Sequence, residues 1–137
     1  MSVPNLHRWA APVLLVASVA GANAQPSTGS ATATPLLAKP LVGIEGKEGV
    51  VLTVEYPPGV ASPSHRHNAN TFVYVLEGSV VMQVAGGDVV TLTQGQTFYE
   101  SPADVHAVSR NASDTKPARI LVFFVKDVGA PATVPAG

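Results

Sequence analysis

The stretch "TFVYVLEGSVVMQVAGGDVVTLT" (71–93) contains three short runs of β-branched and aromatic residues that are separated by glycines. Runs of this length and composition, bounded by turn residues, are typical of β-strands. The second run ends at a Gly-Gly pair, which favours the tight turn of a β-hairpin. The stretch therefore predicts three consecutive strands joined by very short turns, at 71–77, 79–84 and 88–93.

The same pattern continues on both sides of this stretch, and no segment has the 3.6-residue period of a helix. The other strand-like runs are 49–56, 96–100, 104–109 and 119–126. The last of them, "RILVFFVK", is apolar throughout, which predicts a strand buried on both faces. About seven strands with short turns and no helix predict an all-β sandwich or a small barrel.

The N-terminal segment has the features of a secretory signal peptide. A weakly basic start precedes the apolar run "AAPVLLVASVAGA", which is too short to span a bilayer comfortably, and "ANA" before Gln25 is a small-x-small cleavage site. We expect residues 1–24 to be removed after Ala24, which leaves a periplasmic or secreted protein without a membrane anchor. A retained anchoring helix is the alternative, but no stop-transfer pattern follows the run.

Composition then divides the rest of the chain. The Ser/Thr/Ala/Pro tract 25–35 predicts a disordered leader, and 128–137 predicts a disordered tail for the same reason. Between them, 36–127 forms one domain with one modest core. The chain has no cysteine, so its stability must come from that core, from a partner subunit or from a metal.

Charge and hydropathy limit the partners. Nine acidic residues oppose eight basic ones without a basic patch, which excludes nucleic acid and leaves a small molecule as the expected ligand. Several strand runs are apolar on both faces, so they carry more apolar surface than a small barrel interior can take. We therefore expect a homodimer, in which residues 36–44 could extend the sheet of the partner.

His65 and His67 form an H-x-H pair, and alternate side chains of a strand point to the same face. Of the four histidines in the chain, only His106 can complete a set with them, because His7 lies in the expected signal peptide. Three neutral imidazoles suit one divalent transition metal, and their chemistry does not choose among iron, zinc, copper, nickel and manganese. An H-x-H pair alone is a weak signal, since a single histidine is usually a surface or core residue.

Two stretches around these histidines resemble the cupin signatures. "GVASPSHRHNANTFVYVLEG" (59–78) is similar to G-x5-H-x-H-x3,4-E-x6-G, and "GQTFYESPADVHAVSRN" (95–111) is similar to G-x5-P-x-G-x2-H-x3-N. The chain resembles a small single-domain cupin of the type-2 kind from about Leu36 to Lys126. The resemblance implies a single cupin-type jelly-roll barrel (double-stranded β-helix) with one metal near one mouth. The matching positions are Gly59, His65, His67, Gly78, Gly95 and His106.

The chain also departs from these signatures. The glutamate position holds Thr71, the proline and glycine of the second signature fall on Ser101 and Ala103, and its asparagine is displaced to Asn111. We therefore expect no fourth protein ligand, so that the ion would keep its full charge and leave positions open for water or an anion. The Thr71 hydroxyl could orient a water on the metal, and Glu100, close before His106, could reach the site.

Further polar residues on these strands are candidates for the site. Glu77 adjoins a turn and is expected in solvent, whereas Tyr74, Gln83 and Tyr99 are candidates for a polar lining.

Two functions fit these features. One is a metal-dependent enzyme on a small oxygen-bearing molecule, dioxygenase-like with iron or copper and a lyase or isomerase with zinc or nickel. The alternative is a cupin that binds or senses a small molecule or metal without turnover, and a fold does not decide between the two. An immunoglobulin-like sandwich with incidental histidines is the alternative fold.

Overall fold

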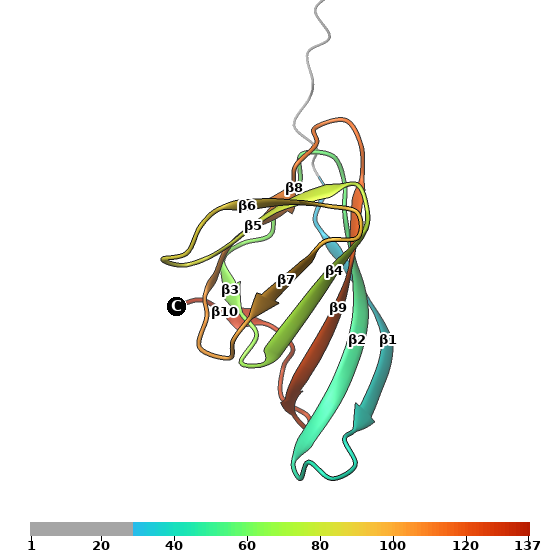
Figure 1. Cartoon of the computed structure of the whole chain (residues 1–137), viewed down its shortest axis with the longest axis vertical. Helices are drawn as coiled ribbons and strands as arrows, with labels where there is room; N and C mark the ends of the chain where they lie inside the picture. The colour runs from blue at the N-terminus through green and yellow to red at the C-terminus, as the bar shows by residue number, and fades with distance from the viewer. Residues whose placement is uncertain (1–28) are drawn as a thin grey trace, which may run out of the picture.

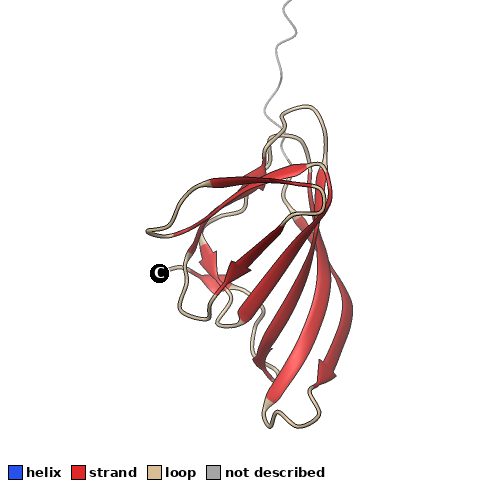
Figure 2. Cartoon of the chain, in the orientation of Figure 1, coloured by secondary structure: helices blue, strands red, loops and turns tan. Residues whose placement is uncertain are grey.

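The computed structural model describes residues 29–137, and every regular element in that range is a β-strand (Figure 2). The expected signal peptide and the start of the expected leader lie outside the described residues. Within 29–137 there is no helix of the length and apolarity needed to cross a membrane.

The described residues form two antiparallel five-stranded sheets, which Figure 1 shows joined through the connections between strands. The larger sheet has the order β1 (Thr32–Pro40), β2 (Lys47–Tyr56), β9 (Ala118–Asp127), β4 (Asn70–Glu77) and β7 (Thr97–Glu100). The other sheet has the order β10 (Val134–Pro135), β3 (His65–Arg66), β8 (His106–Asn111), β5 (Ser79–Val84) and β6 (Val90–Thr93). This is the double-stranded β-helix that the sequence predicts, and all seven expected strands are present.

Strand β9 lies in the middle of the larger sheet, between β2 and β4. Its residues Ile120, Val122 and Phe124 are buried in the core, whereas Leu121 and Phe123, on the opposite face, are only half-buried. The prediction that this strand is buried on both faces is therefore wrong, because its outer face is not fully covered within the described part of the chain. The core is completed from β4 and β5 by Val73, Val75, Val80 and Met82.

Gly78 allows the chain to pass from one sheet to the other between β4 and β5. Its φ is 71°, and a Cβ atom there would lie 2.6 Å from the carbonyl oxygen of Pro117. Only glycine meets both conditions without a shift of the backbone.

The two ends of the described chain are more ordered than composition predicts. β1 starts at Thr32, inside the expected leader, and pairs with β2 of its own chain from Thr32↔Glu55 to Pro40↔Glu48. All nine of its residues are exposed, so hydrogen bonds of the backbone rather than burial hold it, and it leaves no hydrophobic pattern in the sequence. β10 likewise lies in the expected tail, where it pairs with β3.

Asn111, displaced by one position from the second signature, is buried and holds a turn together. Its Nδ2 lies within 3.1 Å of the carbonyl oxygens of Tyr56, Pro57 and Lys116, and its Oδ1 accepts from the backbone N–H of Ser113. The displacement therefore leaves the asparagine with a structural role.

Candidate metal centre

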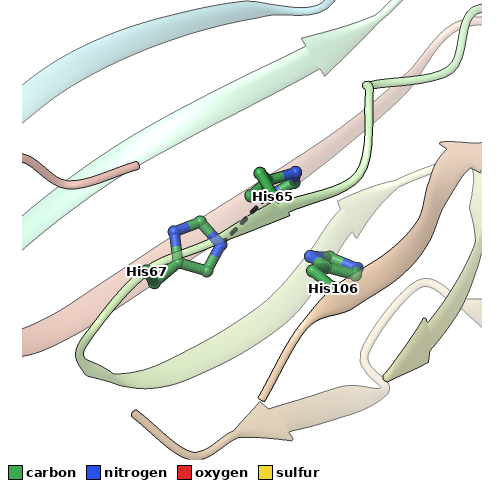
Figure 3. A group of neighbouring side chains, drawn as sticks. All are labelled: His65, His67 and His106. Atoms are coloured by element: carbon green, nitrogen blue, oxygen red, sulfur yellow. Dashed lines mark hydrogen bonds between the residues drawn. The ribbon is translucent and has the colours of Figure 1, made fainter. Parts of the chain in front are cut away.

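The three histidines come from two neighbouring segments. His65 lies on β3 directly opposite His106 of β8, and His67 follows two residues later. Figure 3 shows the three rings turned toward one region from these segments. One candidate ligand atom from each residue can be chosen so that all lie within 4.8 Å of one another. The structure thus brings together the residues that the two signatures single out.

Backbone carbonyl groups fix the tautomers of His65 and His67. The Nδ1 atom of His65 lies 2.7 Å from the carbonyl oxygen of Pro63, and that of His67 lies 2.8 Å from the carbonyl oxygen of Ala132. A carbonyl oxygen only accepts, so both Nδ1 atoms carry a proton, and in the neutral ring each Nε2 atom presents a lone pair. These Nε2 atoms are 3.1 Å apart, as the dashed line in Figure 3 marks.

Two lone pairs at this distance repel each other unless a proton, as in a hydrogen bond, or a metal ion lies between them. Nitrogen ligands about 2.0–2.1 Å from one ion, at tetrahedral or octahedral angles, are about 2.8–3.4 Å apart. The separation of 3.1 Å falls inside this range. The pair therefore fits two adjacent ligands of one transition-metal ion.

His106 supplies the third imidazole and is only 3% exposed. Within the described residues neither of its ring nitrogens has a hydrogen-bond partner. Its Nδ1 lies 3.2 Å from Oε1 of Glu100, but the two groups lack the alignment of a hydrogen bond. Buried polar atoms without partners are rare in proteins, and a bound metal ion would satisfy one of them.

Burial shifts the protonation of the site. It lowers the pKa of the His67 imidazole to about 4 and that of His106 to about 3. For Glu100 burial raises the pKa to about 7, and the negative charge of Asp104 adds to the rise. His67 and His106 are therefore neutral at neutral pH, which is the form that binds metal ions.

The histidines open onto a cavity of about 410 Å³, a size typical of small-molecule sites. Most of its wall is apolar, and Leu52, Val54, Val73, Ile120, Val122 and Phe124 form much of it. Besides the histidines, its polar lining includes Tyr56, Thr71, Glu100 and Ser109. Phe124 also packs on the His67 ring, with 4.8 Å between the ring centroids.

The C-terminal segment 131–135 closes part of this site. Thr133, Val134 and Pro135 line the cavity, and the carbonyl of Ala132 holds His67. The segment is tied down by Lys126, whose Nζ donates to the carbonyl oxygen of Ala130 at 2.6 Å and forms an ion pair with Glu48. Sequence reasoning missed this role, because a tail rich in alanine and proline carries no pattern of burial.

The remaining candidates fall on both sides of the barrel wall. Thr71 and Glu100 lie inside, whereas Tyr74 and Tyr99 are exposed on the outer face of the larger sheet. The side chain of Gln83 donates to the carbonyl of Gly87 within its own hairpin, so the predicted lining role of these two tyrosines and of Gln83 is wrong. Glu77 is exposed, as expected.

Solved structures of similar fold include proteins of known and unknown activity. An uncharacterized conserved protein with a double-stranded β-helix domain from Klebsiella pneumoniae is 24% identical with a TM-score of 0.62, over 82% of this chain and 90% of its own. A recombinant oxalate oxidase in complex with glycolate is 21% identical with a TM-score of 0.62, over 80% of this chain and 56% of its own. The DMSP lyase DddQ from Ruegeria pomeroyi is 22% identical with a TM-score of 0.58, over 64% of this chain and 43% of its own.

These identities show a common fold only. None of the curated proteins compared with the chain matches it. The family model for the cupin domain matches residues 52–124, which include both histidine segments and most strands of the two sheets. The chain therefore belongs to the cupin domain family.

Proposed function

We propose that this cupin binds one divalent transition metal through His65, His67 and His106 and acts as a metal-dependent enzyme on a small oxygen-bearing molecule. One observation carries the proposal. Two Nε2 atoms converge at 3.1 Å, each ring fixed by a carbonyl behind it, beside a third imidazole at the wall of a largely apolar cavity.

The roles of the protein groups follow from their contacts. The carbonyls of Pro63 and Ala132 hold the two imidazoles in the metal-binding tautomer and orientation. The apolar wall would take up the hydrocarbon part of a substrate and exclude water from the site. A bound iron or copper ion would supply oxidation by dioxygen, and a zinc or nickel ion would supply Lewis acidity for a lyase or isomerase.

A cupin that binds a small molecule or metal without turnover is the second candidate, and the composition of the cavity favours it. Apart from the histidines, the only titratable side chains in the lining are Glu100 and Tyr56. The Tyr56 hydroxyl is bonded to Ser109 Oγ at 2.6 Å. The described cavity therefore offers few groups for proton transfer.

Metal analysis followed by an activity screen tests the proposal. We expect the purified protein to carry about one equivalent of a transition metal, since three imidazole ligands make one site. The variants His65→Ala and His106→Ala should lose it. Oxygen uptake with phenolic and diketone compounds would then separate the enzyme from the binding protein. If the purified protein carries no transition metal and binds none when metal is added, the proposal is refuted.

We further propose that the protein is exported. The support is the apolar run and the "ANA" site before Gln25. N-terminal sequencing of the protein from a periplasmic fraction or culture medium should begin at Gln25. Recovery only from the cytoplasm, with Met1 in place, would contradict export.

We also propose that the protein is a homodimer. β1 lies at the edge of the larger sheet with Leu36 and Leu37 exposed, and Phe72, Tyr74 and Tyr99 add exposed aromatic surface on that sheet. Exposed strand edges and apolar patches favour association. Light scattering at micromolar concentration should give the mass of two chains, and a monomer mass would count against the proposal.

A further inference from the structure

Strands β4 and β7 place two site residues directly opposite each other. Thr71, which stands at the glutamate position of the first signature, pairs with Glu100 in the antiparallel ladder. Residues paired in this way point to the same face, with Cβ atoms about 4.5–5.5 Å apart. Both side chains are buried, at 0% and 2% exposure, and both line the cavity of the histidines.

Glu100 has surroundings that suit a metal ligand. Its Oε1 has no hydrogen-bond partner among the described residues. Oε1 lies 3.2 Å from His106 Nδ1, and Oε2 lies 3.9 Å from His67 Nε2, so the carboxylate reaches two of the three imidazoles. A buried carboxylate without a counter-ion or donors is costly, and a divalent cation offsets that cost.

Thr71 leaves room for this arrangement. Its hydroxyl donates to the carbonyl oxygen of Ala69 at 3.3 Å, and its side chain is short. A longer side chain at position 71 would extend further toward the histidines. The short Thr71 leaves that space to a side chain from the facing strand β7.

We infer that Glu100 is the fourth protein ligand of the metal, and that it replaces the carboxylate of the first signature from one strand across the sheet. The inference rests on the proposed metal site. It reverses the expectation from the sequence that the fourth ligand is absent. With Glu100 as a ligand, the net charge of a divalent site falls by one, so it attracts anionic substrates less than three imidazoles alone would.

The alternative is that Glu100 only positions the His106 ring from behind, as outer carboxylates do for many metal-binding histidines. The two roles differ in one testable way. A ligand can be supplied from either strand because only its oxygen atoms must reach the ion. A positioning residue must stay beside His106 Nδ1.

A carboxylate swap separates these roles. We compare the full-length protein, cleared of metal with a chelator, with Glu100→Gln, Glu100→Thr, and the double variant Thr71→Glu/Glu100→Thr. Glu77→Gln, on the exposed end of β4, is the matched control. Calorimetric titration with Zn²⁺ and with Mn²⁺ gives the affinities, the visible spectrum of the Co²⁺ form reports the ligand set, and thermal melting of the metal-free proteins checks the fold.

We expect Glu100→Gln and Glu100→Thr to weaken metal binding by at least about tenfold, and the double variant to recover most of that loss. The Co²⁺ spectrum should change in the single variants and return toward wild type in the swap. If wild type and Glu100→Gln bind the metal with equal affinity, the inference is overturned but the proposed three-histidine site is not. Weak binding that the swap does not restore, in a protein that still folds, assigns Glu100 the positioning role and also overturns it. If the wild type binds neither metal, the proposed function fails together with the inference.

Discussion

Removal of the C-terminal segment 131–137 should weaken metal binding while leaving the barrel intact. A chain that ends at Ala130 keeps the bond from Lys126 to the Ala130 carbonyl, which secures the end of β9. It loses the carbonyl of Ala132, which accepts from His67 Nδ1 at 2.8 Å, and the pairing of β10 with β3. His67 would then be free to rotate and to change tautomer.

The size of the effect follows from the lost contact. Loss of a hydrogen-bond partner behind a metal-binding histidine weakens metal binding by about 10–100-fold, which corresponds to about 1.4–2.8 kcal/mol. The truncation also removes Thr133, Val134 and Pro135 from the cavity wall, so water gains access to the site. We therefore expect the upper half of this range.

Calorimetric titration with Zn²⁺ measures the effect directly. A chain that ends at Pro135 is the matched control, because it lacks only the last two residues and keeps β10. Its affinity should equal that of the full-length protein. If the chain ending at Ala130 also binds Zn²⁺ as tightly as the full-length protein, the C-terminal segment does not hold His67, and the tautomer argument for that residue is refuted.

Three further outcomes follow from the structure. Gly78→Ala should lower the melting temperature by at least about 4–8 °C, because the left-handed backbone costs about 1–2 kcal/mol and the methyl group meets the Pro117 carbonyl. Differential scanning calorimetry measures this shift, and an unchanged melting temperature would contradict the tight turn. Asn111→Ala should lower the free energy of unfolding by about 2–3 kcal/mol, since several buried backbone groups lose their partner. Urea unfolding measures this loss, and an unchanged midpoint would refute the role of Asn111 in holding the turn. Zn²⁺ at about 100 times its Kd should raise the free energy of unfolding of the wild type by about 2.7 kcal/mol, and His67→Ala should lose most of this increase. Urea unfolding with and without Zn²⁺ measures the increase. Equal increases in both proteins would show that Zn²⁺ binds elsewhere.

The sequence predicts local features of this fold well. Strand runs such as 79–84 are rich in β-branched and apolar residues and are bounded by glycines, so the predicted and observed strands agree at β5. The H-x-H pair is local too, and the family signatures supply its distant partner His106. Features that depend on backbone pairing alone leave no such pattern. For this reason the sequence misses β10 and the start of β1, and it expects residues 36–44 to pair with a partner chain, whereas β1 pairs with β2 of its own chain.

The sequence offers Glu100 as a residue that could reach the site, but it does not decide whether the side chain points inward. A charged residue at the end of a strand next to proline is usually exposed, so the local pattern of "FYESP" points to solvent. Its inward direction depends on the register of β7 against β4, two strands that β5 and β6 separate in the sequence. The outer position of Tyr99 follows from the same register, because adjacent residues of a strand point to opposite faces.

The pairing of positions 71 and 100 leads to a prediction about related cupins. Because positions 71 and 100 face each other across β4 and β7, a carboxylate at either one reaches the same histidines. Carboxylates at both positions would repel each other in a buried site and hold more negative charge than one divalent ion needs. Cupins with the same spacing between the two signatures should therefore carry an acidic residue at one of the two positions and a neutral residue at the other. Comparison of aligned family members would check this, and frequent pairs of acidic residues at both positions would show that the two carboxylates do not share one ion.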